Sequence, residues 1–87
     1  MATRKSMGEC LDRCANAIEF AEKQYNVHAR QEHYNDLEYT EALVGLENAF
    51  NELEAMDNSA NDQQRDMLNR MKIQVQDIQH AMVVRRR

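Results

Sequence analysis

Residues 39–62 read YTEALVGLENAFNELEAMDNSAND, and this stretch contains both a helical repeat and the point where it ends. Its apolar residues recur every three or four positions, the spacing that places side chains on one face of an α-helix. They are Tyr39, Ala42, Leu46, Ala49, Leu53 and Met56, with Leu43 and Phe50 beside them. The DNSAND cluster then predicts a turn, and we expect Ser59 with Asp62 to begin the next helix.

The same repeat continues on both sides of this stretch. It runs earlier through Met7, Leu11, Cys14, Ile18, Ala21 and Tyr25, and later through Leu68, Met71, Val75, Ile78 and Met82. Ser6 and Glu9 match a capping box, so the first helix is expected to begin near residue 7. Asn35, followed by acidic residues, is expected to cap the second helix. We therefore predict one all-α domain over residues 1–87, an antiparallel three-helix bundle with helices near 7–32, 35–57 and 60–84.

A second arrangement fits the same periodicity. The first repeat continues in phase through His28, Glu32 and Asn35, so residues 7–57 could form one long helix. That helix would make a long hairpin with the last segment and would have to oligomerise. Three polar residues in the apolar face favour a break instead. Gly45 lies inside the second helix, where glycine lowers helix stability. We therefore expect a glycine at this position to allow a close approach by a neighbouring helix.

The composition excludes several classes of protein. Sixteen of the 87 residues are Val, Ile, Leu or Phe, and the chain has no Pro, no Trp and only two Gly. These counts argue against collagen-like chains and hairpin-rich β folds, and the short apolar runs argue against a membrane span or a signal peptide. So small a core leaves a lone domain marginally stable, and self-association would remedy this.

Charge is distributed unevenly along the chain. Residues 35–58 carry seven acidic and no basic side chains, whereas residues 59–87 carry six basic and three acidic ones. We expect the acidic middle to pack beside the basic end within one bundle. An alternative is an acidic face that binds a basic partner. A further alternative is weak nucleic-acid binding through the basic tail, Arg85, Arg86 and Arg87, although a pI near 5.3 favours a solvated helix end.

No catalytic motif stands out. Cys10 and Cys14 lie four residues apart and could offer two thiolates to a metal, with His28, His33 or His80 as further ligands. A structural zinc site needs four ligands, however, and no second ligand pair is evident. We expect both cysteines to pack as small apolar residues. With no glycine-rich phosphate loop, we predict no enzyme, no cofactor and no small-molecule substrate.

Apolar residues away from the repeat provide the best functional indication. Phe20, Val27 and Tyr34 are spaced by seven residues, as are Leu37 and Val44, and Ile73 is similarly placed in the last segment. Aligned apolar residues of this kind predict a contact surface for self-association or for a partner helix. The other interpretation is that they widen the core. The sequence therefore predicts a non-enzymatic helical interaction or structural protein.

Two sequence blocks carry a family resemblance. The first is QEHYND at residues 31–36 with EYTEA at 38–42, and the second is SANDQQR at 59–65. With the chain length, they resemble the YtzC family, small helical proteins of spore-forming Gram-positive bacteria. The resemblance implies a cytoplasmic bacterial protein, and it implies no activity, cofactor or catalytic residue.

Overall fold

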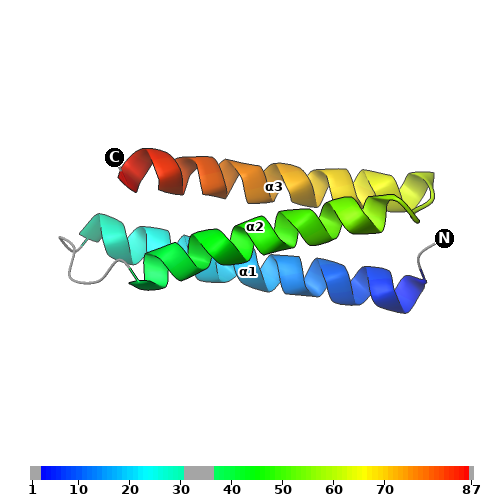
Figure 1. The fold of residues 1–87 in the computed structure, drawn as a ribbon, viewed down its shortest axis with the longest axis horizontal. Helices are drawn as coiled ribbons and strands as arrows, with labels where there is room; N and C mark the ends of the chain where they lie inside the picture. Colours follow the sequence, from blue (N-terminus) through cyan, green and yellow to red (C-terminus); the bar gives the residue numbers. More distant parts are fainter. Residues whose placement is uncertain (1–2, 31–36, 87) are drawn as a thin grey trace.

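The computed structural model describes residues 3–30 and 37–86. They form three helices, α1 (Arg4–Arg30), α2 (Leu37–Asp57) and α3 (Asp62–Arg86), and no strand. α2 runs antiparallel to both α1 and α3, and each helix packs against the other two (Figure 1). The bundle measures 46 × 19 × 15 Å. The predicted all-α antiparallel three-helix bundle is confirmed.

The alternative of one long helix over residues 7–57 is wrong. α1 and α2 lie side by side in opposite directions, which a continuous helix cannot do (Figure 1). The physical reason is that both segments carry an apolar face of the same phase. Folding one segment back on the other removes both faces from water, whereas a straight helix would leave both exposed.

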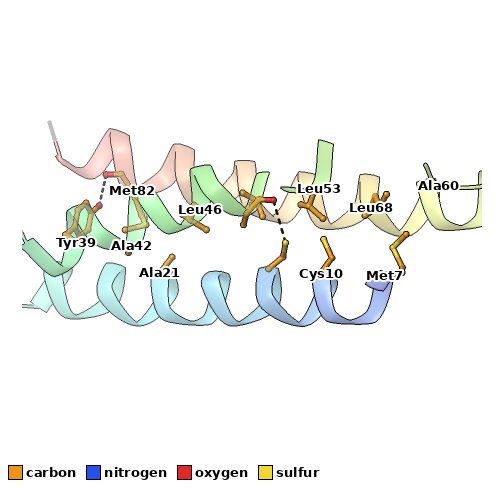
Figure 2. Close-up of a cluster of buried hydrophobic side chains, with 13 residues drawn as sticks. Met7, Cys10, Ala21, Tyr39, Ala42, Leu46, Leu53, Ala60, Leu68 and Met82 are labelled. Atoms are coloured by element: carbon orange, nitrogen blue, oxygen red, sulfur yellow. Dashed lines mark hydrogen bonds between the residues drawn. The ribbon is translucent and has the colours of Figure 1, made fainter. Parts of the chain in front are cut away.

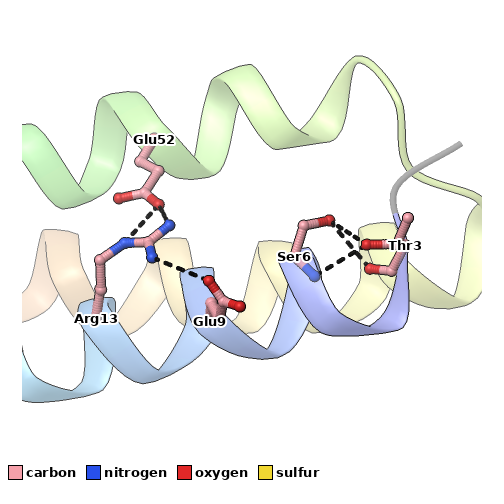
Figure 3. Close-up of polar contacts among 5 residues, drawn as sticks. All are labelled: Thr3, Ser6, Glu9, Arg13 and Glu52. Atoms are coloured by element: carbon pink, nitrogen blue, oxygen red, sulfur yellow. Dashed lines mark hydrogen bonds and ion pairs between the residues drawn. The ribbon is translucent and has the colours of Figure 1, made fainter.

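α1 begins earlier than the sequence indicated, because Thr3 rather than Ser6 is its cap. The Ser6 N–H donates to Thr3 Oγ1 at 3.0 Å, and the two hydroxyls hydrogen-bond at 2.8 Å (Figure 3). Ser6 is thus in the first turn of the helix, where it supports the cap. The predicted Ser6–Glu9 capping box is therefore wrong. Glu9 is instead part of an ion pair, in which its Oε2 lies 4.0 Å from Arg13 Nη1.

The start of α3 is also shifted from the prediction. Asn61 and Gln64 form a reciprocal capping box, in which the Gln64 N–H donates to Asn61 Oδ1 at 2.9 Å and the Asn61 N–H donates to Gln64 Oε1 at 3.0 Å. Ser59, the predicted cap, closes α2 instead, because its N–H and hydroxyl both donate to the Met56 carbonyl. The predicted cap at Asn35 lies outside the described residues.

One apolar cluster fills the centre of the bundle (Figure 2). α1 contributes small side chains and Met7, whereas the largest fully buried side chains come from α2 and α3. Small residues on one helix allow the larger side chains of its neighbours to fill the space between the three axes. The buried set comprises Met7, Cys10, Cys14, Ala21, Tyr39, Ala42, Leu46, Ala49, Leu53, Ala60, Leu68, Val75 and Met82.

A buried hydrogen bond joins the beginning of α2 to the end of α3. The Tyr39 side chain is only 2 % exposed, and its hydroxyl donates to the Met82 carbonyl at 2.6 Å (Figure 2). Burying a hydroxyl without a hydrogen-bond partner would cost folding free energy. The bond to Met82 removes that cost, so the large ring of Tyr39 can be buried at this end of the core.

We expect Tyr39→Phe to lower the free energy of unfolding by about 0.5–1.5 kcal/mol, because one buried hydrogen bond is lost. Urea denaturation followed by circular dichroism measures this change. Tyr25→Phe is the matched control, since Tyr25 is half-buried and water can replace its contact with Arg85. Equal losses in the two variants would contradict the prediction.

Gly45 does not serve the close approach predicted for it. A Cβ atom added at Gly45, or at Gly8 in α1, would meet no other atom within 4 Å. Gly45 lies one heptad before Glu52, and Glu52 contacts Arg13 of α1, so Gly45 is on the flank of α2 that borders α1. The glycine therefore leaves open space beside α1.

Gly45→Ala should raise the free energy of unfolding by about 0.5–1 kcal/mol, because alanine stabilises a helix interior and meets no obstacle here. Gly8→Ala should act in the same direction. Urea denaturation compares both variants with the parent chain. A destabilised Gly45→Ala beside a stabilised Gly8→Ala would show that something else occupies the space at Gly45.

Candidate functional site

Four of the apolar residues singled out from the sequence lie outside the core. Phe20 and Val27 of α1 are each 41 % exposed, and Leu37 and Val44 of α2 are 62 % and 50 % exposed. Tyr34, the fifth residue of that set, lies outside the described residues. α3 adds four exposed apolar residues, of which only Ile73 was singled out from the sequence; they are Met67, Ile73, Val83 and Val84. Met67, Val83 and Val84 are irregularly spaced and form no aligned stripe, which is the signal that singled out Phe20 and Val27.

Phe20 and Val27 lie on the side of α1 that borders α2. They follow Arg13 by one and two heptads, so the three residues share one flank of the helix. The Arg13 side chain crosses to α2, where its Nε lies 2.9 Å from Glu52 Oε1 (Figure 3). We call Phe20 and Val27 the α1 flank. A shallow hollow beside Phe20 is lined by Asn16, Glu19 and Lys23.

Leu37 and Val44 lie on a different surface, the side of α2 opposite its buried residues. Val44 falls midway between buried Ala42 and Leu46, so it projects away from them. We call this surface the outer face of α2. Its residues are all exposed, and they are Leu37, Glu41, Val44, Glu47, Asn48, Asn51, Glu54 and Ala55.

The acidic residues of α2 are not neutralised by α3. α2 packs beside α3, as the charge pattern predicted, yet no ion pair joins the two helices among residues 3–30 and 37–86. Arg65 and Arg70 form ion pairs within α3. Arg65 Nη1 lies 3.9 Å from Asp62 Oδ1, and Arg70 Nη2 lies 3.1 Å from Asp66 Oδ2. The outer face of α2 therefore keeps its negative charge.

Arg85 is exposed near the end of α3, and it also contacts Tyr25 of α1. Its guanidinium carbon lies 4.7 Å from the centre of the Tyr25 ring, and its Nη2 donates to the Tyr25 hydroxyl at 3.3 Å. A cation over an aromatic face is stabilising, and this contact ties the end of α3 to α1. α3 continues to Arg86, and Arg87 lies outside the described residues. An open hollow at this end is lined by Tyr25, His80, Ala81, Val84 and Arg85.

Both cysteines are buried in the core, as predicted. Cys10 and Cys14 have no exposed surface, and the Cys14 thiol donates to the Ala49 carbonyl at 3.7 Å. Burial raises the pKa of the Cys10 thiol, and it raises the pKa of Cys14 to about 12. A neutral thiol is a poor nucleophile and a poor metal ligand, because the thiolate is the reactive form.

The structure does not assemble the metal site considered from the sequence. In the described part of the chain, no three His, Cys, Asp or Glu side chains are grouped so that they could hold a metal ion. His80 is near the end of α3, whereas Cys10 is near the start of α1, which runs parallel to α3 (Figure 1). The side chains of His28 and His33 are not among those described. None of the described helices is long and apolar enough to cross a membrane.

The raised pKa of Cys14 predicts a loss of stability at alkaline pH. The unfolded chain loses the Cys14 thiol proton near the ordinary pKa of 9.0, whereas the folded chain holds it to higher pH. The stability that the neutral thiol contributes is therefore complete below pH 9, and it declines as pH rises towards 12. Cys14→Ala should make the fall in unfolding free energy above pH 9 less steep. Urea denaturation across this range measures both slopes, and parallel slopes would contradict the prediction.

Comparisons with known proteins place the chain in a family. The family described as "Protein of unknown function (DUF2524)" matches residues 1–84. The uncharacterized protein YtzC of Bacillus subtilis (strain 168) is 46 % identical over 84 residues, which cover 97 % of this chain and 93 % of that protein. The resemblance to the YtzC family is thus confirmed. No solved structure matches the chain. The protein belongs to the DUF2524 family of proteins of unknown function.

Proposed function

We propose that this protein is a non-enzymatic helical interaction protein that self-associates through the α1 flank. The observation that carries the proposal is the exposure of Phe20 and Val27, 41 % each, one heptad apart on the same side of α1. Two apolar residues in this register are the arrangement with which one helix packs against another.

The setting of the α1 flank supports pairing between two copies. Charges of both signs surround Phe20, because Glu19 and Lys23 line the hollow beside it. Two such surfaces can meet without the like-charge repulsion that would oppose pairing. The open space at Gly45, on the neighbouring flank of α2, leaves room for a side chain of the second copy.

Energetic considerations support the same proposal. Each square ångström of apolar surface removed from water contributes about 25 cal/mol. The core of the single chain is narrow and contains several small residues, Cys10, Cys14, Ala21, Ala42 and Ala49 among them. A small bundle of this kind is marginally stable alone, and association would add apolar burial.

The non-enzymatic part of the proposal rests on the chemistry of the described side chains. The two thiols are held neutral in the core, and Arg85 is occupied by Tyr25. We place the protein in the cytoplasm, as the family resemblance implies, and expect coiled-coil packing between copies. The basic tail is not part of this proposal.

Phe20→Ser combined with Val27→Ser should reduce the assembly to the monomer mass without loss of helicity, because both side chains lie outside the core. Light scattering after size exclusion measures the mass, at low and high salt, and circular dichroism measures the helicity. Ile73→Ser is the matched control, since Ile73 is an exposed apolar residue of α3 at 58 % exposure. A parent chain that is monomeric throughout, or a double variant with the parent mass, would refute the proposal.

A further inference from the structure

We infer that the outer face of α2 is a docking surface for a basic amphipathic helix of another protein. This face is separate from the α1 flank, so the inference goes beyond self-association. It rests on the charge of the face, on its two apolar residues and on what this chain itself can offer to cover it.

The charge of the outer face has one sign. Glu41 lies on one side of Val44, and Glu47 and Glu54 lie on the other. No cationic residue occurs anywhere in α2, and none of these three carboxylates takes part in an ion pair within residues 3–30 and 37–86. Clustered carboxylates of this kind attract a cationic partner and steer its approach.

The apolar residues of the face define the shape of the partner. Leu37 and Val44 are 62 % and 50 % exposed and lie one heptad apart, two turns along the helix. A second helix lying along α2 would place apolar side chains against both residues. Beyond Val44 the stripe continues through Asn48, Asn51 and Ala55, which are polar or small. The apolar contact is therefore concentrated in the first half of α2.

A second copy of this chain is a poor occupant of the face. Pairing α2 with α2 would bring two sets of unpaired carboxylates together, which is destabilising. α3 carries five of the eleven basic residues of the chain, and two of them, Arg65 and Arg70, are paired with Asp62 and Asp66. Arg85 is likewise engaged, by the ring of Tyr25. α1 and α3 both mix basic with acidic side chains, so neither offers the wholly basic surface that would best complement this face, and a different protein is the better partner.

These features specify the partner by its chemistry. It is a helix with leucine or isoleucine in heptad register, which would cover Leu37 and Val44. Lysine or arginine on both sides of that stripe would reach Glu41 on one edge of α2 and Glu47 with Glu54 on the other. Such partly exposed ion pairs contribute mainly to association rate and specificity, while the apolar contact supplies affinity.

The probe for this inference is a synthetic peptide with leucines in heptad register and lysines on both flanks, carrying a fluorescent label. Its control is a peptide of identical composition in scrambled order, which has the same charge and no apolar stripe. Fluorescence anisotropy measures binding to the full chain, and amide chemical shifts locate the peptide. The patterned peptide should bind, weaken as salt rises, and shift amides of α2.

Variants of the outer face provide the decisive comparison. Val44→Ser should weaken binding of the patterned peptide by about tenfold, the factor that corresponds to about 1.4 kcal/mol. Glu47→Gln with Glu54→Gln should weaken binding by a smaller factor and should reduce its dependence on salt. Ile73→Ser on α3 should leave binding unchanged. All substituted residues are exposed, and circular dichroism confirms folding of each variant.

The inference is overturned if the scrambled peptide binds as tightly, if the shifted amides lie outside α2, or if the Val44→Ser chain binds like the parent. Its failure is distinguishable from failure of the proposed self-association. Peptide binding reports on the outer face of α2, whereas the assembly mass reports on Phe20 and Val27. The chain with Phe20→Ser and Val27→Ser should therefore still bind the patterned peptide.

Discussion

The small side chains of α1, packed against the larger ones of α2 and α3, hold the whole bundle together. Cys10, Cys14 and Ala21 have no exposed surface, and neither do Leu46 and Leu53 on the facing helix. Thiols suit these positions because they are small and apolar when neutral, and the core keeps them neutral by raising their pKa values. The same packing that stabilises the fold thus removes the two cysteines from chemistry.

Packing of this kind uses one face of each helix and leaves the remaining faces to solvent. On α1 the side next to α2 shows Phe20 and Val27 among charges of both signs. On α2 the side opposite the core shows Leu37 and Val44 among carboxylates alone. The two surfaces differ in charge more than in apolar character, so they suit different partners. The α1 flank suits the same surface of a second copy, whereas the outer face of α2 suits a cationic partner.

Contacts at the two ends of the bundle limit how the helices can move. At one end Tyr39 donates to the Met82 carbonyl, and Arg85 lies over Tyr25, so both neighbours of α3 are tied to its last turns. At the other end Asn61 and Gln64 cap α3 after a short turn. Arg13 with Glu52 joins α1 to α2 between these ends. The exposed faces therefore lie on helices whose ends are held by side-chain contacts, and a surface that is ordered before binding lowers the entropic cost of binding.

Helical periodicity is a local property, and for that reason the helices, their buried positions and the break after Met56 could all be predicted from residue order. The same periodicity set Phe20, Val27, Leu37 and Val44 apart from the repeat, but it left open whether they are exposed or widen the core, and the packing of the helices leaves them exposed. Caps were misplaced by a few residues, because Thr3 and Asn61 stand close to other residues that can also cap a helix, and residue type alone does not rank them. The choice between one long helix and two antiparallel ones, the open space at Gly45 and the contact of Arg85 with Tyr25 depend on residues far apart in the chain. Only the packing of three helices brings those residues together, so the tertiary structure alone decided them.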